Sequence, residues 1–226
     1  IPKFYSDFEA QRSGDGNFRS TTRDVRKLID SLSKENISGI IIDLREDGGG
    51  SLQEAIELTG LFIKNGPVVQ VKNADGKIDI AEDPDPNIVY DGPLAVLVNR
   101  FSASASEIFA GAIQDYERGI IIGEQTFGKG TVQNLIDLNR VSTNRNNTLG
   151  QLKITIAKYY RVSGASTQNR GVIPDISFPS AIDPKDFGES AEPSALPYDE
   201  IKSAVYNKYE DIKKFIPELK AKHEKR

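Results

Sequence analysis

The chain has 226 residues, of which 38% are hydrophobic and 27% charged, so it can bury a globular core. Its formal net charge of −4 offers no basic field to attract nucleic acid, and we expect no nucleic-acid partner. The absence of cysteine removes disulfides, thiol nucleophiles and thiolate metal sites. Because the chain starts at Ile1 and contains no methionine, we expect a piece of a longer protein.

Alternating strands and helices run through the first half of the chain. Helical spacing of apolar residues predicts a first helix over residues 22–35, with Thr21 or Thr22 as its N-cap. Short apolar runs rich in β-branched residues predict buried strands at 39–44, 94–98 and 119–123. Helical spacing predicts further helices at 52–62 and 105–116. This order predicts an α/β fold with a mostly parallel sheet and an active site at the carboxyl ends of its strands.

The remaining segments predict a smaller second layer and an extension. Alternating or exposed apolar residues indicate strands at 68–71, 131–138 and 151–162, whereas the acidic residues 73–88 indicate a loop. Residues 179–197 are rich in proline, serine and acidic side chains, and residues 198–226 look helical and charged. We therefore divide the chain into a core of residues 1–180 and a linker with a charged helical extension of residues 181–226. We expect this extension to be dispensable for the fold of the core.

Histidine chemistry is nearly excluded, because the only histidine, His223, lies in a basic C-terminal tail where a solvated side chain is expected. A hydrolase with this composition needs a serine or threonine nucleophile and a base other than histidine, and lysine is a known alternative. A lysine base must be neutral, so its pKa must fall from about 10.4 to near 7, at a differential free energy of about 4 kcal/mol. That requirement predicts a dry pocket.

A serine-rich segment, residues 101–107, follows one predicted strand and begins an apolar helix. It would place a hydroxyl beside a helix N-terminus, which favours developing negative charge. The same pattern is typical of helix capping, since serine is a preferred N-cap and Glu107 lies three residues after Ser104. From the residues alone both interpretations stay open.

A second segment, residues 123–130, has most of a phosphate-binding loop, G-x-x-x-x-G-K. The residue after Lys129 is Gly130, so the hydroxyl that binds magnesium is missing. The alternating sequence that follows predicts a strand, which offers no helix N-terminus to a phosphate. Nucleotide binding is therefore disfavoured.

Three stretches, residues 41–55, 101–133 and 155–176, resemble the tail-specific (C-terminal processing) proteases of the S41 type. The resemblance implies a ClpP/crotonase-like core in which Ser104 is the nucleophile, Lys129 the general base and Gln133 the residue that orients the lysine. It also implies supporting roles for a further set of residues: Glu107, Asp115 and Thr126. We predict that Lys129 is buried and reaches the Ser104 hydroxyl, with a looser fit when no substrate is bound.

The glycines at residues 48–50 resemble the oxyanion-hole segment of this family. The resemblance implies that a backbone amide, most simply that of Gly49, joins the amide of Ala105, and glycine allows such close approach of main chain. A plain tight turn is the alternative interpretation. The chain departs from the family at Asp47, where asparagine is usual.

The resemblance also implies partners and a compartment. It implies protein or peptide substrates with nonpolar C-termini, an adaptor protein, no cofactor, and a periplasmic or otherwise extracytoplasmic location, with membrane association through the parent protein. The family's PDZ module and N-terminal regions are absent from this chain, and without them we expect poor cleavage. The same fold also includes non-proteolytic acyl-thioester enzymes and inactive binding modules, which fold class alone does not exclude.

Overall fold

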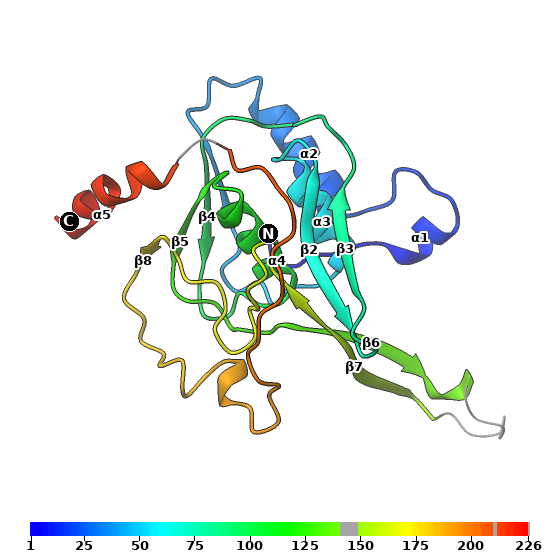
Figure 1. Ribbon diagram of the computed structural model, residues 1–226. Helices are drawn as coiled ribbons and strands as arrows, with labels where there is room; N and C mark the ends of the chain where they lie inside the picture. Colours follow the sequence, from blue (N-terminus) through cyan, green and yellow to red (C-terminus); the bar gives the residue numbers. More distant parts are fainter. Residues whose placement is uncertain (141–148, 210–211, 226) are drawn as a thin grey trace.

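The computed structural model describes residues 1–140, 149–209 and 212–225 (Figure 1). Its first sheet is parallel, with the strand order β1-β4-β5-β8. These strands are β1 (Ile40–Asp43), β4 (Leu94–Val98), β5 (Ile120–Gly123) and β8 (Ile176–Ser177). The three longer strands confirm the predicted parallel sheet, whereas the short β8 was not predicted from the sequence.

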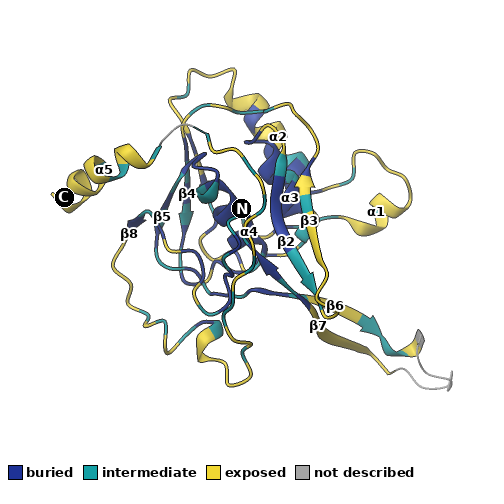
Figure 2. Cartoon of the chain, viewed as in Figure 1, coloured by how far each residue is buried: buried dark blue, intermediate teal, exposed yellow. Residues whose placement is uncertain are grey.

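The second sheet is antiparallel, with the strand order β3-β2-β7-β6. These strands are β2 (Gly66–Asn73), β3 (Ile78–Asp83), β6 (Thr131–Asp137) and β7 (Gln151–Tyr160). The hairpin of β6 and β7 extends away from the body of the molecule, and its outer part is exposed (Figures 1 and 2). Its inner end adjoins the core, where Tyr159 and Tyr160 are buried.

One helix, α4 (Ala105–Asp115), is buried almost all round, with residues 105–113 all buried (Figure 2). It packs against α3 (Leu52–Gly60), against β5 of the parallel sheet and against β2 of the antiparallel sheet. A helix between two sheets has no face left for solvent, which explains its apolar composition. The N-terminus of α4 is thereby fixed between the two sheets.

The remaining elements are short or peripheral. The helices are α1 (Phe8–Arg12), α2 (Thr21–Leu32) and α5 (Ile216–Glu224), and the 3-10 turns are η1 (Leu138–Arg140), η2 (Glu189–Ala191) and η3 (Ile212–Phe215). No helix in the described ranges has the length and apolar character needed to cross a bilayer.

Three local predictions were wrong. The N-cap of α2 is Ser20, whose hydroxyl accepts the Arg23 N–H at 3.2 Å, and not Thr21 or Thr22. Residues 73–88 contain the strand β3, whose acidic composition is that of an exposed sheet edge. The helix predicted at residues 52–62 is shorter, because α3 ends at Gly60. A Cβ at Gly60 would lie 2.6 Å from the Asp83 side chain.

The prediction of a helical C-terminal extension is correct only for its end. Residues 198–209 contain no helix and lie along the core, while residues 210, 211 and 226 of the predicted range fall outside the described residues. Ile201 N–H donates to Gly164 O, and Ala204 N–H donates to Val162 O, each at 2.9 Å. Backbone hydrogen bonds to the core compete with helix formation here, which local sequence does not reveal.

Candidate active site

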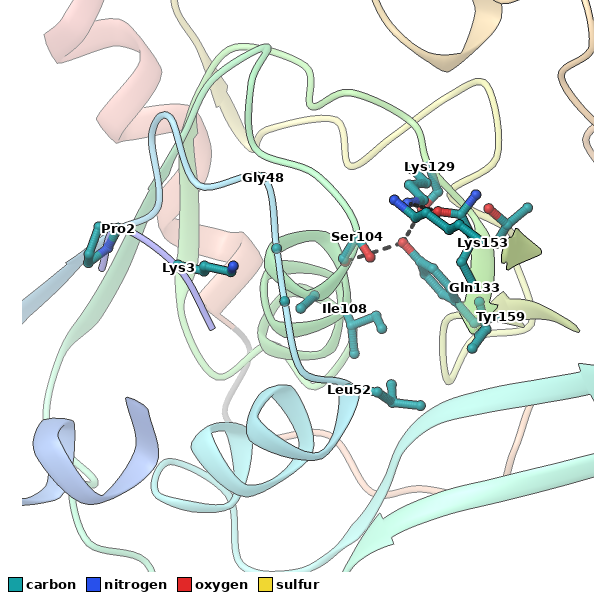
Figure 3. A pocket seen from close by; sticks show the side chains of 15 residues that line it. Pro2, Lys3, Gly48, Leu52, Ser104, Ile108, Lys129, Gln133, Lys153 and Tyr159 are labelled. Carbon is teal, nitrogen blue, oxygen red and sulfur yellow. Dashed lines mark hydrogen bonds between the residues drawn. The ribbon is translucent and has the colours of Figure 1, made fainter. Parts of the chain in front are cut away.

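A cavity of about 470 Å³ opens where α4 begins, between the two sheets (Figure 3). Its lining comes from separate parts of the chain: residues 48–50 after β1, Ser104 and Ala105 at the start of α4, Lys129 before β6, Gln133 on β6, and Lys153 and Tyr159 on β7. The structure therefore brings the predicted nucleophile, base, lysine-orienting glutamine and glycine turn to one cavity.

Ser104 lies immediately before α4 in an unusual backbone conformation, with φ of +58° and ψ of −112°. Non-glycine residues rarely adopt positive φ, and such residues cluster at functional sites. Ala105 is the first residue of α4, so its N–H has no acceptor within the helix. It lies at the N-terminus of α4, which is the positive end of the helix dipole. The predicted hydroxyl beside a helix N-terminus is present.

The Glu107 carboxylate joins the loops that carry Ser104 and Lys129. One oxygen, Oε2, accepts the backbone N–H of Ser104 at 2.8 Å and that of Lys129 at 3.0 Å. The other, Oε1, accepts the Thr126 hydroxyl at 2.6 Å and the Gly128 N–H at 2.7 Å. Burial raises the pKa of Glu107 to about 7, and these four hydrogen bonds oppose the rise. Glu107 and Thr126 thus lie beneath the site as packing and hydrogen-bonding groups.

The Lys129 side chain is half-buried, and its Nζ donates to Oε1 of Gln133 at 2.8 Å. Burial lowers the pKa of Lys129, and the positive charge of Lys153 lowers it further. Within the described ranges the structure records no hydrogen bond between the Lys129 ammonium and the Ser104 hydroxyl. The lysine is therefore paired with its predicted orienting residue, while the predicted contact with the nucleophile is not formed.

Tyr159 is a site residue that the sequence did not indicate. Its hydroxyl is buried, lies 3.2 Å from Ser104 O and also contacts Lys129 O (Figure 3). The alternation of β7 predicts which residues share a face, but only the packing of β7 beside the start of α4 places this hydroxyl between the two carbonyl groups. Tyr159 thus contacts the main chain of both predicted catalytic residues.

The turn at residues 48–50 packs directly on the serine loop. Gly49 has φ of +96°, and a Cβ there would lie 2.7 Å from Ala103 O and 2.9 Å from Ala105 N. The Gly49 N–H, predicted as an oxyanion donor, instead donates to Oδ1 of Asp47 at 2.8 Å. The glycine is required for close approach, but its amide has an internal acceptor in this structure.

Asp47 is completely buried below this turn. Its main-chain oxygen accepts the Ala103 N–H at 3.0 Å and the Ser106 hydroxyl at 2.8 Å. Its Oδ2 has no hydrogen-bond partner in the described part of the chain, and burial raises its pKa. The departure from asparagine therefore leaves one buried carboxylate oxygen unpaired.

Asp115, predicted as a supporting residue, lies at the other end of α4. At about 1.5 Å per residue, eleven residues separate it from Ser104 by about 16 Å. Its carboxylate pairs with Arg161 through Nη2 at 2.6 Å and Nε at 3.0 Å, and accepts the Ser163 hydroxyl at 2.9 Å. The structure thus does not bring Asp115 to the cavity, and it links α4 to the segment after β7.

No group of three or more histidine, cysteine, aspartate or glutamate side chains is arranged to bind a metal ion among the residues described. The polar groups at the cavity are hydroxyl, amine, amide and backbone N–H groups. These are the groups that serine acyl transfer uses.

Comparison with known proteins agrees with this chemistry. Residues 4–178 match Peptidase family S41, and residues 182–226 match the C-terminal domain of tail specific protease. The chain therefore belongs to peptidase family S41.

Individual relatives define the branch of the family. The tail-specific protease of Haemophilus influenzae is 54% identical over 185 residues, which are 82% of this chain and 27% of that protein. The chloroplastic C-terminal processing peptidase of Tetradesmus obliquus is 34% identical, over 74% of this chain and 34% of that protein. The solved photosystem II D1 C-terminal processing protease superposes with a TM-score of 0.63 at 32% identity, covering 82% of this chain and 42% of that one. The chain thus spans about a third or less of the length of these two curated relatives.

Proposed function

We propose that the protein is a serine endopeptidase that processes or degrades proteins from their C-terminal tails, with Ser104 as nucleophile and Lys129 as general base. The observation that supports this most directly is the Glu107 carboxylate, which accepts the main-chain N–H groups of both residues. A buried carboxyl group that accepts N–H groups from two loops fixes the loops relative to each other, as catalysis by groups from separate loops requires.

In the proposed reaction the Ser104 hydroxyl attacks the scissile carbonyl carbon while neutral Lys129 Nζ accepts its proton. The bond between the carbonyl carbon and the amide nitrogen then breaks, and Lys129 returns the proton to the leaving amine. Lys129 then deprotonates a water molecule, whose oxygen attacks the acyl carbon. The bond between that carbon and Ser104 Oγ breaks, and Lys129 gives the proton to Oγ, which restores both groups. Gln133 directs the amine throughout, because its Oε1 accepts one Nζ hydrogen.

The tetrahedral oxyanion needs fixed donors. The Ala105 N–H is one candidate, since the first turn of a helix leaves its amides without internal partners. For Gly49 to be the second, its N–H must turn from Asp47 toward the substrate oxygen. In this proposal substrate binding adjusts the glycine turn and forms the contact between Ser104 and Lys129.

The whole protein's setting is proposed from its relatives. Similarity to the H. influenzae tail-specific protease favours protein substrates. The finer features follow only from the resemblance of the sequence to its family: substrates with nonpolar C-termini, a periplasmic or otherwise extracytoplasmic location, and a PDZ module in the parent protein. An adaptor protein that delivers substrates belongs to the same proposal. If the PDZ module binds preferentially to the core in its catalytically competent conformation, it raises the population of that conformation. Without the module this chain would therefore cleave slowly.

Labelling with a serine-directed fluorophosphonate, followed by peptide mapping, tests the nucleophile. We expect modification at Ser104 in the wild-type chain and none in Ser104→Ala. Cleavage of an unstructured polypeptide by the chain and by its full-length parent, each beside its Ser104→Ala control, tests the activity. Labelling elsewhere, or cleavage that survives Ser104→Ala, would contradict the proposal.

A further inference from the structure

The cavity beside Ser104 is cationic in a chain whose net charge is −4. Its lining includes Lys3, Lys129 and Lys153, and no aspartate or glutamate side chain is among the lining residues. Within the described ranges the structure records no ion pair for Lys3 or Lys153. Unpaired ammonium groups thus converge on the place where a substrate chain would lie.

Strand register places Lys153 next to the base. On the β6–β7 hairpin Gln133 pairs with Thr155 and Leu135 with Lys153. Because alternate residues share a face, Lys153 lies diagonally across from Gln133, the acceptor for Lys129. Figure 3 shows Lys153 beside Lys129 and Gln133, with Lys3 on the other side of Ser104.

Carboxylates around the site do not line the cavity surface. Asp137 lies diagonally across the hairpin from Lys153, but it accepts hydrogen bonds from Asn139 and is not among the lining residues. The same holds for three other carboxylates. Asp47 and Glu107 are completely buried below the cavity, and Glu107 already accepts four hydrogen bonds. Glu189, in η2, accepts the side-chain amide of Gln168 at 3.0 Å. None of the three lines the cavity, so an anionic ligand would meet only cations there.

We propose that this cavity binds a carboxylate of the polypeptide substrate and that Lys153, assisted by Lys3 across the site, selects for it. The inference rests on the proposed peptidase function and names a substrate feature beyond it. Lys153 suits this role better than Lys129, which must lose its proton to act as a base. Lys153 is exposed and has no part in the proposed proton transfer. The carboxylate can come from an acidic side chain near the scissile bond or from the free C-terminus.

Four internally quenched peptides of one unstructured sequence separate these sources. They combine glutamate or glutamine two residues from the cleaved bond with a free or amidated C-terminus. Specificity constants are measured at one pH for the wild-type chain and for Lys153→Gln, Lys153→Glu and Lys3→Gln. Lys34→Gln, which removes the same charge away from the cavity, is the matched control.

For a partly exposed ion pair, we expect the wild-type chain to prefer the carboxylate peptide over its neutral partner by about threefold to fivefold in at least one arm. Lys153→Gln should bring that ratio close to one, Lys153→Glu should invert it, and Lys34→Gln should leave it unchanged. Raising the salt concentration should also reduce the wild-type ratio.

A wild-type ratio of one in both arms, or a preference that survives Lys153→Gln, would overturn the inference. The peptidase function and carboxylate selection by Lys153 are tested separately. Ser104-dependent cleavage of the neutral peptide supports the peptidase function, whatever the ratio of specificity constants for the carboxylate and neutral peptides. Absence of Ser104-dependent cleavage of all four peptides, by the chain and by its full-length parent, would count against both.

Discussion

The Lys129 ammonium lies 2.8 Å from Oε1 of Gln133, on the side of the cavity formed by β6 and β7. This contact uses one hydrogen of the Lys129 side chain and leaves the remaining positions on Nζ for the proton transfers of the proposed mechanism. It also holds the half-buried Lys129 side chain at the site without a carboxylate partner. A carboxylate partner would favour the protonated form of the lysine.

Lys129→Arg should abolish activity, because a guanidinium is not deprotonated near neutral pH. In the wild type, burial and the charge of Lys153 both lower the pKa of Lys129. In the proposed mechanism only the neutral amine accepts the proton. The pH profile of kcat/KM should therefore rise with pH, with its midpoint below 10.5. Lys34→Arg is the control, and wild-type turnover by Lys129→Arg would refute the assignment.

Glu107→Gln should lower activity at least about tenfold, since an amide NH₂ would face two of the four donors that Glu107 now accepts. The pKa of Glu107 rises from 4.5 to about 7, so the folded state binds this proton more tightly than the unfolded state. The stability that this group contributes is present below about pH 4.5 and is lost as pH rises through about 7.

Urea unfolding at pH 5 and pH 8 measures that contribution. The free energy of unfolding of the wild type should exceed that of Glu107→Gln by less at pH 8 than at pH 5. The difference between the wild type and the exposed control Glu9→Gln should not change with pH in this way. An advantage that grows with pH would mean that the four hydrogen bonds outweigh burial.

Asp47→Asn should stabilise the protein by about 1 kcal/mol at pH 8, because it removes a buried charge whose Oδ2 has no recorded partner. Asparagine retains the oxygen that accepts the Gly49 N–H. Burial raises the pKa of Asp47, so the aspartate destabilises the fold increasingly as pH rises above 3.8. The stability gained by the variant, measured by urea unfolding against Asp30→Asn, should shrink toward pH 4. A loss of stability at pH 8 would contradict this account.

Truncation after Ser180 should destabilise the core by about 3 kcal/mol or more, contrary to the expectation from the sequence that residues 181–226 are dispensable. The buried Arg100 guanidinium donates to Phe187 O at 2.7 and 3.0 Å and to Pro184 O at 3.2 Å, and it would lose these partners. Thermal unfolding beside a truncation after Tyr209, which keeps these contacts, isolates the effect. Equal melting temperatures for both truncations would restore the original expectation.

Local sequence patterns predicted secondary structure correctly where the structure of a segment depends mainly on its own residues. The continuous apolar runs at β1, β4 and β5 correctly predicted the parallel sheet. Burial on both faces, which such runs also indicate, is wrong for β1, where Ile41 is 66% exposed. Local patterns failed for β3, where an acidic edge strand resembles a loop, and for residues 198–209, whose hydrogen bonds go to the core rather than to a helix.

The sequence by itself determined the α/β class and, through its resemblance, a family assignment and a set of residues that included Ser104, Lys129 and Gln133. Tertiary structure alone decided that Tyr159 touches the main chain of both Ser104 and Lys129, and that Asp115 lies far from them. It also decided that the Gly49 N–H donates to Asp47 and that Lys153 lies beside Lys129. The physical reason is that chemical type and local periodicity are encoded residue by residue. Distances between residues remote in the chain depend instead on how α4 and the two sheets pack together.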